Sequence, residues 1–427
     1  MHDFTFKKEE LYCEDVPVSR IVEACGTPAY IYSHSTILSH FKKIEAAFKP
    51  VNPLICFSMK ANSSLAVCRL LAKAGSGFDI VSGGELYRAL KVKVSPKKIV
   101  YASVGKTPEE IKEAIRAGIL CFNVESIPEL ETIEAVARKV KKRARIALRL
   151  NPDVDAHTHR FITTGTKENK FGMGPEDVFQ TFLHAGDYPH LDFVGIHLHI
   201  GSQILETGPY VQAIECALQV VERIKAAKIP RLTVEYLNIG GGFGIIYKDE
   251  EAQTADDFAR AVIPLLASSG LKIILEPGRF IVGNAGIMVT RVLYVKKAAT
   301  KTFVIVDAGM NDLIRPALYG AYHEILPLKQ RSASSTAMDA VMVADIVGPV
   351  CESGDFLAKD RRLPRVEAGE YLAVMGAGAY GFVMASNYNS RLKPCEVMVF
   401  KGRYAVVRKR ERYQELIKNE VIPSKLQ

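Results

Sequence analysis

Apolar residues follow two alternating patterns between residues 54 and 276. Short continuous apolar runs are typical of buried strands, and apolar positions spaced three or four residues apart are typical of helices that pack one face on a core. The expected strands are 54–59, 78–81, 98–102, 119–124, 145–150, 192–199, 233–239 and 272–275. The helices expected between and around them are 63–74, 85–91, 108–117, 127–141, 176–185, 208–227 and 255–268. This strict alternation favours a (β/α)₈ barrel over an open doubly wound sheet.

The pattern changes on either side of that region. After residue 285 the chain has strand-like runs at 286–294, 303–306, 342–347, 371–375 and 395–400, with few helical patterns between them. These runs predict an all-β domain. Upstream, a strand is expected at 28–32 and a helix at 35–48, and the serine-rich stretch 326–340 is expected to form a hairpin tip or surface loop.

Composition narrows the class of protein. The 427 residues are 48% hydrophobic and 24% charged, which is typical of a soluble globular protein large enough for two domains. The chain has neither a run of apolar residues long enough to span a membrane nor an apolar signal core at its N-terminus, so a cytoplasmic protein is expected. Eight cysteines stand singly with no CxxC pair, which suits a reducing compartment and argues against a zinc site or a disulfide framework.

The formal net charge is +9. This excess would attract an anionic ligand such as a phosphorylated cofactor, but a solvated surface with more lysine than acid is the favoured explanation. The densest basic run, 408–412, is interrupted by an acid and lacks an aromatic stripe, so no nucleic-acid partner is expected.

Polar and glycine-rich residues cluster just after the predicted strands, at the face where barrels place their chemistry. Lys60 follows the strand 54–59 directly. Partial burial would lower the pKa of its amine and suit it to attack a carbonyl. The alternative is a strand-end lysine whose amine reaches solvent.

Two further strand ends carry candidate ligand-binding groups. The glycines 240–242 and 244 would let backbone N–H groups close on a phosphate, although a plain tight turn explains them equally well and they do not match a dinucleotide fingerprint. Glu276 could hold the proton of a pyridine-type nitrogen, and the amides of Gly278 and Arg279 could add phosphate donors. The alternative is an ion pair between Glu276 and Arg279.

His197 and His199 alternate on one predicted strand and should face the same way. Two such histidines can bind zinc, but no third ligand recurs nearby, and His157 and His159 lie in a separate loop. A histidine stacked on a flat ring and a buried core histidine both remain open. Ser202 is a candidate phosphate donor.

The all-β region carries the remaining candidates. Cys351 is followed by Glu352 in GPVCESGD, and neighbouring acids should raise the pKa of its thiol, which suits a proton donor better than a thiolate nucleophile. The alternative is a turn with a buried cysteine. Arg315 is a candidate for binding a carboxylate, and Tyr319 and Tyr380 are further candidates for ligand binding in the same region. The alternatives are a surface ion pair for the arginine and packed side chains for the tyrosines.

Together these motifs resemble the alanine-racemase-like, fold type III family of pyridoxal-phosphate decarboxylases, in particular the diaminopimelate decarboxylases. The resemblance covers nearly the whole chain and runs in order through FSMKAN, GFDIVSGGEL, NKFGM, GIHLHIGSQ, NIGGGFG, LEPGR, DAGMNDLIRPALYGAYHEI, GPVCESGD and GAGAYGFVMASNYNSR. It implies a pyridoxal-phosphate-binding (β/α)₈ barrel at 36–283 and a β domain, sandwich-like or barrel-like, at 284–427. The segment 1–35 would join the β domain.

The resemblance also implies roles for the candidate residues. Lys60 would carry the cofactor as a Schiff base, and Cys351 would be the proton donor. The cofactor would be held by Lys60, His199, Ser202, Gly240, Gly241, Gly242, Glu276, Gly278, Arg279 and Tyr380. The substrate would be bound by Arg279, Arg315, Tyr319, Glu352 and Tyr380. No metal site is implied.

The implied reaction is decarboxylation of meso-2,6-diaminopimelate to L-lysine, the last step of lysine biosynthesis, by a homodimer in which the Cys351–Glu352 loop serves the neighbouring subunit. A decarboxylase of another basic amino acid, such as ornithine, arginine or lysine, is the alternative on the same fold. A racemase should carry a tyrosine base in place of Cys351, and a non-catalytic homologue would have no need to keep Lys60, Glu276 and Cys351 together.

Overall fold

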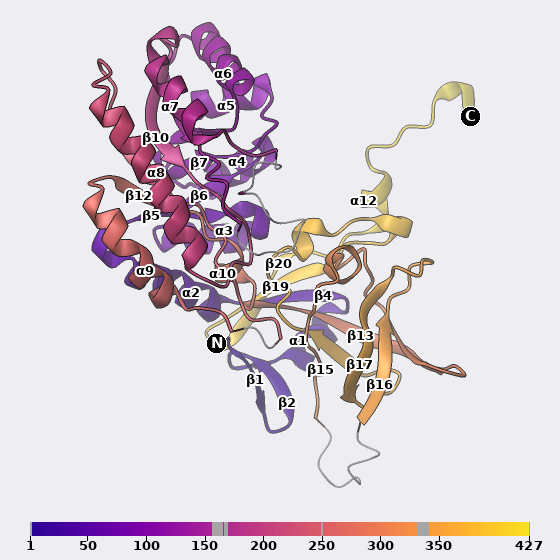
Figure 1. Cartoon of the computed structure of the whole chain (residues 1–427). Helices are drawn as coiled ribbons and strands as arrows, with labels where there is room; N and C mark the ends of the chain where they lie inside the picture. The colour runs from indigo at the N-terminus through magenta and orange to yellow at the C-terminus, as the bar shows by residue number, and fades with distance from the viewer. Residues whose placement is uncertain (1, 156–164, 166–169, 249–250, 331–340, 427) are drawn as a thin grey trace. The chain divides into compact units, whose positions relative to one another are not determined.

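The computed structural model describes residues 2–155, 165, 170–248, 251–330 and 341–426. Two compact units make up the chain (Figure 1). The barrel unit comprises Leu38–Ile246 and Glu250–Ile281, and the β unit comprises Met1–Ile37, Tyr247–Asp249 and Val282–Gln427. His157, His159 and residues 331–340 of the serine-rich stretch lie outside the described residues.

Eight parallel strands close the barrel in the order β10-β11-β12-β5-β6-β7-β8-β9. This confirms the predicted (β/α)₈ barrel. The strands are β5 (Leu54–Ser58), β6 (Gly77–Ile80), β7 (Ile99–Tyr101), β8 (Cys121–Val124), β9 (Ala144–Arg149), β10 (Leu191–His197), β11 (Tyr236–Asn238) and β12 (Lys272–Leu275). The strand predicted at 192–199 ends two residues early, at His197, so His199 lies in the loop beyond it.

Helices surround the strands on the outside of the barrel (Figure 1). They are α3 (Leu65–Lys73), α4 (Gly83–Lys91), α5 (Pro108–Ala117), α6 (Ile127–Val140), α7 (Pro175–Leu183), α8 (Gly208–Ala226) and α9 (Ala255–Ser268). The start of α5 shows why the sequence sets these boundaries. Thr107 and Glu110 form a capping box, in which each side chain accepts a hydrogen bond from the other residue's backbone N–H, and Pro108 occupies the first helical position.

The two ends of the strands differ in polarity. An apolar cluster that includes Cys56, Cys121, Ala147 and Ile274 fills part of the barrel interior. Side chains alternate between the two faces of a strand, so the residue two positions after each of these four points to the same side. Those four residues are all polar: Ser58, Asn123 and Arg149 lie in their strands, and Glu276 directly follows β12. The barrel is therefore packed with hydrocarbon toward the start of its strands and with polar side chains at their carboxyl ends.

The β unit contains a three-stranded sheet and a nine-stranded sheet. The small sheet has β1 (Phe4–Lys7), β2 (Glu10–Cys13) and β3 (Val16–Pro17), next to α1 (Val18–Cys25). The large sheet has β4 (Ala29–Ser33), β13 (Gly286–Lys297), β14 (Thr302–Val306), β15 (Ile325–Pro327), β16 (Val341–Val347), β17 (Phe356–Pro364), β18 (Tyr371–Val374), β19 (Cys395–Phe400) and β20 (Arg403–Arg408). Because β4 pairs with both β13 and β19, the N-terminal segment is part of this sheet.

Three strands of the large sheet, β15, β17 and β20, were not predicted. β15 includes Leu326 and Pro327, which were expected to lie in a hairpin tip or surface loop but pair with β18 instead. Both β17 and β20 stand at the ends of the strand order, and their sequences, FLAKDRRLP and RYAVVR, are rich in charge. An edge strand has one unpaired side and needs no continuous apolar run, so the apolar pattern misses it. α2 (His34–Ala47) begins in the β unit and continues into the barrel unit, while α10 (Arg279–Val282), α11 (Arg315–Tyr319) and α12 (Tyr413–Ile417) are short. Among the residues that the structure describes, no helix is long and apolar enough to cross a membrane.

Candidate active site

Lys60 lies in a 3-10 turn, Met59–Ala61, that begins where β5 ends. Its Nζ is 2.9 Å from Oδ2 of Asp79 on β6, and Lys60 is one-third exposed whereas Asp79 is fully buried. Burial raises the pKa of Asp79, and the Lys60 ammonium acts in the opposite direction. Lys60 therefore presents its amine at the carboxyl ends of the strands, held by one carboxylate oxygen.

Glu276 follows β12 and is only 2% exposed. Its Oε1 accepts hydrogen bonds from the side-chain amides of Asn123 (3.0 Å) and Asn238 (2.6 Å), and its Oε2 lies 3.2 Å from Nε2 of His197. Burial favours the neutral acid, but the charge and hydrogen bond of His197, together with the charge of Lys60, outweigh it and lower the pKa of Glu276 to about 2. The carboxylate is thus ionised at neutral pH and available to a cationic partner.

His199 lies beside the glycine run, and its Nδ1 accepts a 3.4 Å hydrogen bond from the Gly241 amide. Burial lowers the pKa of His199 well below its usual value, and the positive charges of Lys60 and Arg149 lower it further. The imidazole is therefore neutral. A neutral, planar group suits contact with the face of a flat cationic ring.

The glycine run is required by close packing. A Cβ at Gly241 would lie 1.9 Å from the carbonyl oxygen of Glu276, and Gly242 has a left-handed φ of +105°. The amide of Gly240 donates to Oδ1 of Asn238 at 2.9 Å. Glycine thus brings this loop against the backbone that carries Glu276, which explains the run even before any ligand is considered.

Ser202 and Arg279 supply a hydroxyl and a cation beside these loops. Nη2 of Arg279 donates to Oγ of Ser202 at 3.2 Å, and Arg279 is almost fully buried. A Cβ at Gly278 would meet the Cβ atoms of Ser58 and Ala61 at 3.0 and 3.1 Å, so this turn also packs tightly on the Lys60 segment. A buried guanidinium paired with a hydroxyl is suited to an anion.

Sequence reasoning missed the polar residues that hold these groups. Asp79, Asn123 and Asn238 each interrupt an otherwise apolar strand, in GFDI, CFNV and YLN. A polar residue inside a buried strand costs free energy unless it is hydrogen-bonded, and this was the available signal. It was overlooked because the strands were identified by their apolar neighbours.

A buried ionic network supports the site from one side. Nζ of Lys106 lies 2.6 Å from Glu129 and donates to the carbonyl oxygen of Asn123 at 2.8 Å. Arg149 pairs with Glu125 at 2.7 Å and donates to the carbonyl oxygen of His199 at 3.1 Å. Burial lowers the pKa of Lys106 and raises that of Glu129, with each group's charge opposing the shift of the other. The network contacts the backbone of two residues of the site.

The other predicted site residues belong to the β unit. Arg315 begins α11, is almost fully buried, and lies 2.8 Å from Nε2 of His323 and over the Tyr247 ring. Tyr319 ends the same helix. Tyr380 has a left-handed φ of 55°.

Cys351 and Glu352 are both exposed. The exposure of Cys351 overturns the alternative of a turn built around a buried cysteine. Its Sγ lies 3.4 Å from Oδ1 of Asn389, and Glu352 accepts a 2.8 Å hydrogen bond from Tyr388. In each unit, therefore, the structure describes one group of the predicted residues: those from Lys60 to Arg279 in the barrel unit and those from Arg315 to Tyr380 in the β unit.

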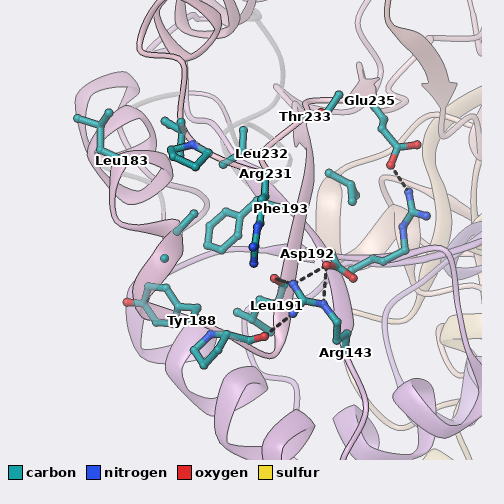
Figure 2. Close-up of a pocket in the computed structure, with 17 residues that line it drawn as sticks. Arg143, Leu183, Tyr188, Leu191, Asp192, Phe193, Arg231, Leu232, Thr233 and Glu235 are labelled. Carbon is teal, nitrogen blue, oxygen red and sulfur yellow. Dashed lines mark hydrogen bonds and ion pairs between the residues drawn. The ribbon is translucent and has the colours of Figure 1, made fainter.

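A separate cavity of about 680 Å³ opens near the start of β10 and β11 (Figure 2). Four of its charged side chains form two ion pairs, Arg143 with Asp192 at 2.6 Å and Arg145 with Glu235 at 2.9 Å, and Arg231 also lines it. The lining that the structure describes includes no lysine, histidine, serine or cysteine. It therefore offers no primary amine, and the polar carboxyl ends of the strands, where Lys60 lies, are the candidate active site.

Comparisons with known proteins agree with this location. The family model for the pyridoxal-binding domain of pyridoxal-dependent decarboxylases matches residues 34–283. A diaminopimelate decarboxylase of Neisseria meningitidis serogroup A is 46% identical over 411 residues, covering 96% of this chain and 99% of that protein. The chain belongs to the diaminopimelate decarboxylase family. A relative of the same name from Aquifex aeolicus is also 46% identical, over 96% of each chain.

Solved structures of the family have the same fold. The crystal structure of diaminopimelate decarboxylase from Helicobacter pylori complexed with L-lysine has a TM-score of 0.89 and 42% identity, and the match covers 94% of this chain and 98% of that chain. A lysine/ornithine decarboxylase from Vibrio vulnificus complexed with cadaverine has a TM-score of 0.78 at 22% identity, which shows a shared fold.

Pyridoxal phosphate is the cofactor of this family, and the residues present fit it. A primary amine is available at Lys60, an ionised carboxylate at Glu276 suits a protonated ring nitrogen, and Arg279 with Ser202 suits a phosphate. In the part of the chain that the structure describes, Oδ1 of Asp79 and Nδ1 of His197 are buried and have no hydrogen-bond partner. Buried polar atoms without a hydrogen-bond partner are unusual in a protein interior, and here they are consistent with a site that binds a polar ligand.

Proposed function

We propose that this chain decarboxylates meso-2,6-diaminopimelate to L-lysine and carbon dioxide, as the last step of lysine biosynthesis in the cytoplasm. The observation that carries the proposal is the barrel-unit site itself: an accessible lysine amine and an ionised, fully buried glutamate at the same ends of the strands. The substrate assignment is supported by relatives of that name at 46% identity over nearly the whole chain.

Residues of the barrel, 36–283, would hold the cofactor. Lys60 would bind its aldehyde carbon, and Asp79 would orient the Lys60 amine. His199 would cover one face of the ring, and Glu276 would accept the hydrogen bond of the ring N–H. Phosphate binding is assigned to Ser202, Gly240, Gly241, Gly242, Gly278 and Arg279. When bound, pyridoxal phosphate supplies the electron sink that lets a carboxylate leave as carbon dioxide.

Residues of the β domain, 284–427 with the segment 1–35, would recognise the substrate and supply the proton. Cys351 would give the proton of its Sγ to the carbon that has lost carbon dioxide, and the thiolate would regain a proton from solvent. Glu352 would bind the far ammonium of the substrate, and Tyr319 and Tyr380 would complete the pocket. We further propose a homodimer in which Cys351 and Glu352 serve the site of the neighbouring subunit.

The distal carboxylate distinguishes the proposed substrate from ornithine and lysine. Arg279 and Arg315 are 7% and 6% exposed, and a buried guanidinium is suited to bidentate binding of a carboxylate. Diaminopimelate keeps a carboxylate at its far end after the reacting end is used, whereas the other basic amino acids do not. A site built around such a group is expected to disfavour analogues that lack it by about 10⁴-fold in kcat/KM.

The test is a comparison of substrates. The purified protein is mixed with pyridoxal phosphate and, separately, with meso-diaminopimelate, lysine, ornithine and arginine, and carbon dioxide release is measured. Release from diaminopimelate alone is expected, and Lys60→Ala should abolish it. Release from ornithine but not from diaminopimelate would replace this proposal with the alternative decarboxylase.

A further inference from the structure

The dipeptide Tyr388–Asn389 contacts the side chains of both Cys351 and Glu352. Oδ1 of Asn389 lies 3.4 Å from the backbone nitrogen of Cys351 and 3.4 Å from its Sγ. Oη of Tyr388 donates to Oε2 of Glu352 at 2.8 Å. Two consecutive residues therefore each hold one member of the Cys351–Glu352 pair, Asn389 from 38 positions and Tyr388 from 36 positions further along the chain.

The direction of these bonds fixes what each partner does. Both atoms of Cys351 that face Asn389 are donors, so the amide oxygen must be the atom that faces them. One acceptor that binds the backbone N–H and the thiol of the same residue restricts the rotation of that side chain. The side-chain amide of Asn389 is neutral and does not take the S–H proton. The contact therefore orients the thiol of Cys351 while the thiol stays protonated.

The two supporting loops are themselves anchored. Asp355 accepts hydrogen bonds from the amides of Val350 and Met310, at 2.6 Å each, which closes the loop that carries Cys351. Asn389 has a left-handed φ of 55°, a conformation that asparagine tolerates better than most residues. The backbone of the Cys351 loop is thus held by Asp355, while the side chains of Cys351 and Glu352 are held by Asn389 and Tyr388.

We propose that Asn389 is a positioning residue for the proton donor Cys351 and that Tyr388 is a positioning residue for the substrate-binding Glu352. This inference rests on the proposed function. In the reaction, the S–H bond of Cys351 breaks and a C–H bond forms at the carbon that lost carbon dioxide. A thiol held by Asn389 delivers its proton to one face of that carbon. Without that contact, water competes for the same carbon from either face.

The experiment follows both rate and stereochemistry in the holoenzyme. Turnover of meso-diaminopimelate in D₂O places one deuterium on the Cε of lysine, and NMR reports which of its two positions is labelled. Asn389→Gly removes the acceptor while allowing the left-handed backbone. We expect kcat to fall about 10-fold, a part of what a general acid contributes, and the label to spread over both positions. Asn389→Asp keeps an acceptor oxygen at the same place and should restore a single labelled position.

Asn387 provides a matched control in the same loop. Its Nδ2 donates to the Arg391 carbonyl oxygen at 2.9 Å and to Glu411 at 2.7 Å, and no hydrogen bond described for it reaches Cys351 or Glu352. Asn387→Ala should therefore disturb the loop but keep one labelled position. Scrambled label in Asn387→Ala equal to that in Asn389→Gly would assign the effect to loop integrity and overturn the positioning role.

Tyr388→Phe tests the second half of the proposal. It removes only the hydroxyl that holds Glu352, and a hydrogen bond to a charged group is worth enough to raise KM for diaminopimelate about 5- to 10-fold. The effect should fall on KM more than on kcat, and the label should remain at one position. An equal loss in kcat with scrambled label would contradict separate roles for the two residues.

The outcomes separate this inference from the proposed function. If Cys351→Ala loses turnover while Asn389→Gly keeps both its rate and a single labelled position, Asn389 does not position the donor and the proposed function stands. If Cys351→Ala itself turns over normally, the proton-donor assignment is wrong, and the positioning proposal falls with it.

Discussion

Two groups of residues, the buried carboxylates of the barrel unit and the Cys351–Glu352 pair of the β unit, are held in opposite ways. In the barrel unit, Glu276 and Asp79 are fully enclosed, and Glu276 has three side-chain partners. In the β unit, Cys351 and Glu352 stand on an exposed loop and each has one side-chain partner from a second loop. The barrel group is preorganised by burial, whereas the β group is held by a few contacts that solvent can reach.

This difference agrees with the division of labour that we propose. A buried carboxylate whose pKa is lowered to about 2 keeps its charge through every step, which suits a group that only has to bind. A group that must give away a proton and recover it from solvent needs access to water. The exposed loop also suits a proton donor that serves a second subunit.

The largest expected effect is on kcat and comes from removing the exposed thiol of Cys351 in the β unit. Cys351→Ala should keep the visible absorbance of the bound cofactor but lower kcat by about 10²-fold or more, because it removes the proposed proton donor to the carbon that loses carbon dioxide. Stopped-flow or steady-state carbon dioxide release measures it. The half-buried Cys216 in α8 is the control, and Cys216→Ala should be unaffected. A Cys351→Ala variant with near-normal kcat would show that the exposed group is dispensable.

The next largest effect is on the free energy of unfolding and comes from removing a buried cation, Lys106, in the barrel unit. Lys106→Met leaves Glu129 buried without its cation and should lower the free energy of unfolding by about 3–5 kcal/mol, measured by urea denaturation. The exposed pair Lys225–Glu222, at 2.9 Å, is the matched control, and Lys225→Met should cost less than about 1 kcal/mol. Equal losses in the two variants would mean that the buried network does not rigidify the barrel site.

The smallest expected effect is on the pH dependence of stability, which can be compared between one buried acid in each unit. Burial raises the pKa of Glu85 in the barrel unit and of Asp312 in the β unit, each to about 7. Both therefore bind a proton more tightly in the folded state. Their stabilising contribution is complete below the unfolded pKa, near 4, and is lost as pH rises through about 7.

Glu85→Gln and Asp312→Asn should remove this dependence. Between pH 5 and pH 8, each variant should gain stability relative to the parent, by at most about 3 kcal/mol. Urea midpoints at the two pH values measure the change. A gain confined to one variant would show that the two interiors differ in polarity as well as in accessibility.

How far the sequence predicts the molecule also differs between the units. The barrel follows from local apolar patterns, and Lys60 and Glu276 stand out because they come directly after strands. Asp79 and Asn123 were missed because an isolated polar residue in a short strand gives no hint of its partner. In the β unit, edge strands such as β17 lack an apolar pattern, and the contact between Cys351 and Asn389 joins two loops that no periodicity connects.

The central claim is that the amine of Lys60 forms the covalent bond to the aldehyde of pyridoxal phosphate. Borohydride reduction of the holoenzyme makes that bond permanent, and peptide mass mapping locates it. The account predicts a phosphopyridoxyl group on the peptide that contains Lys60 and none on that peptide in Lys60→Ala. A label on any other lysine of the native enzyme would contradict it.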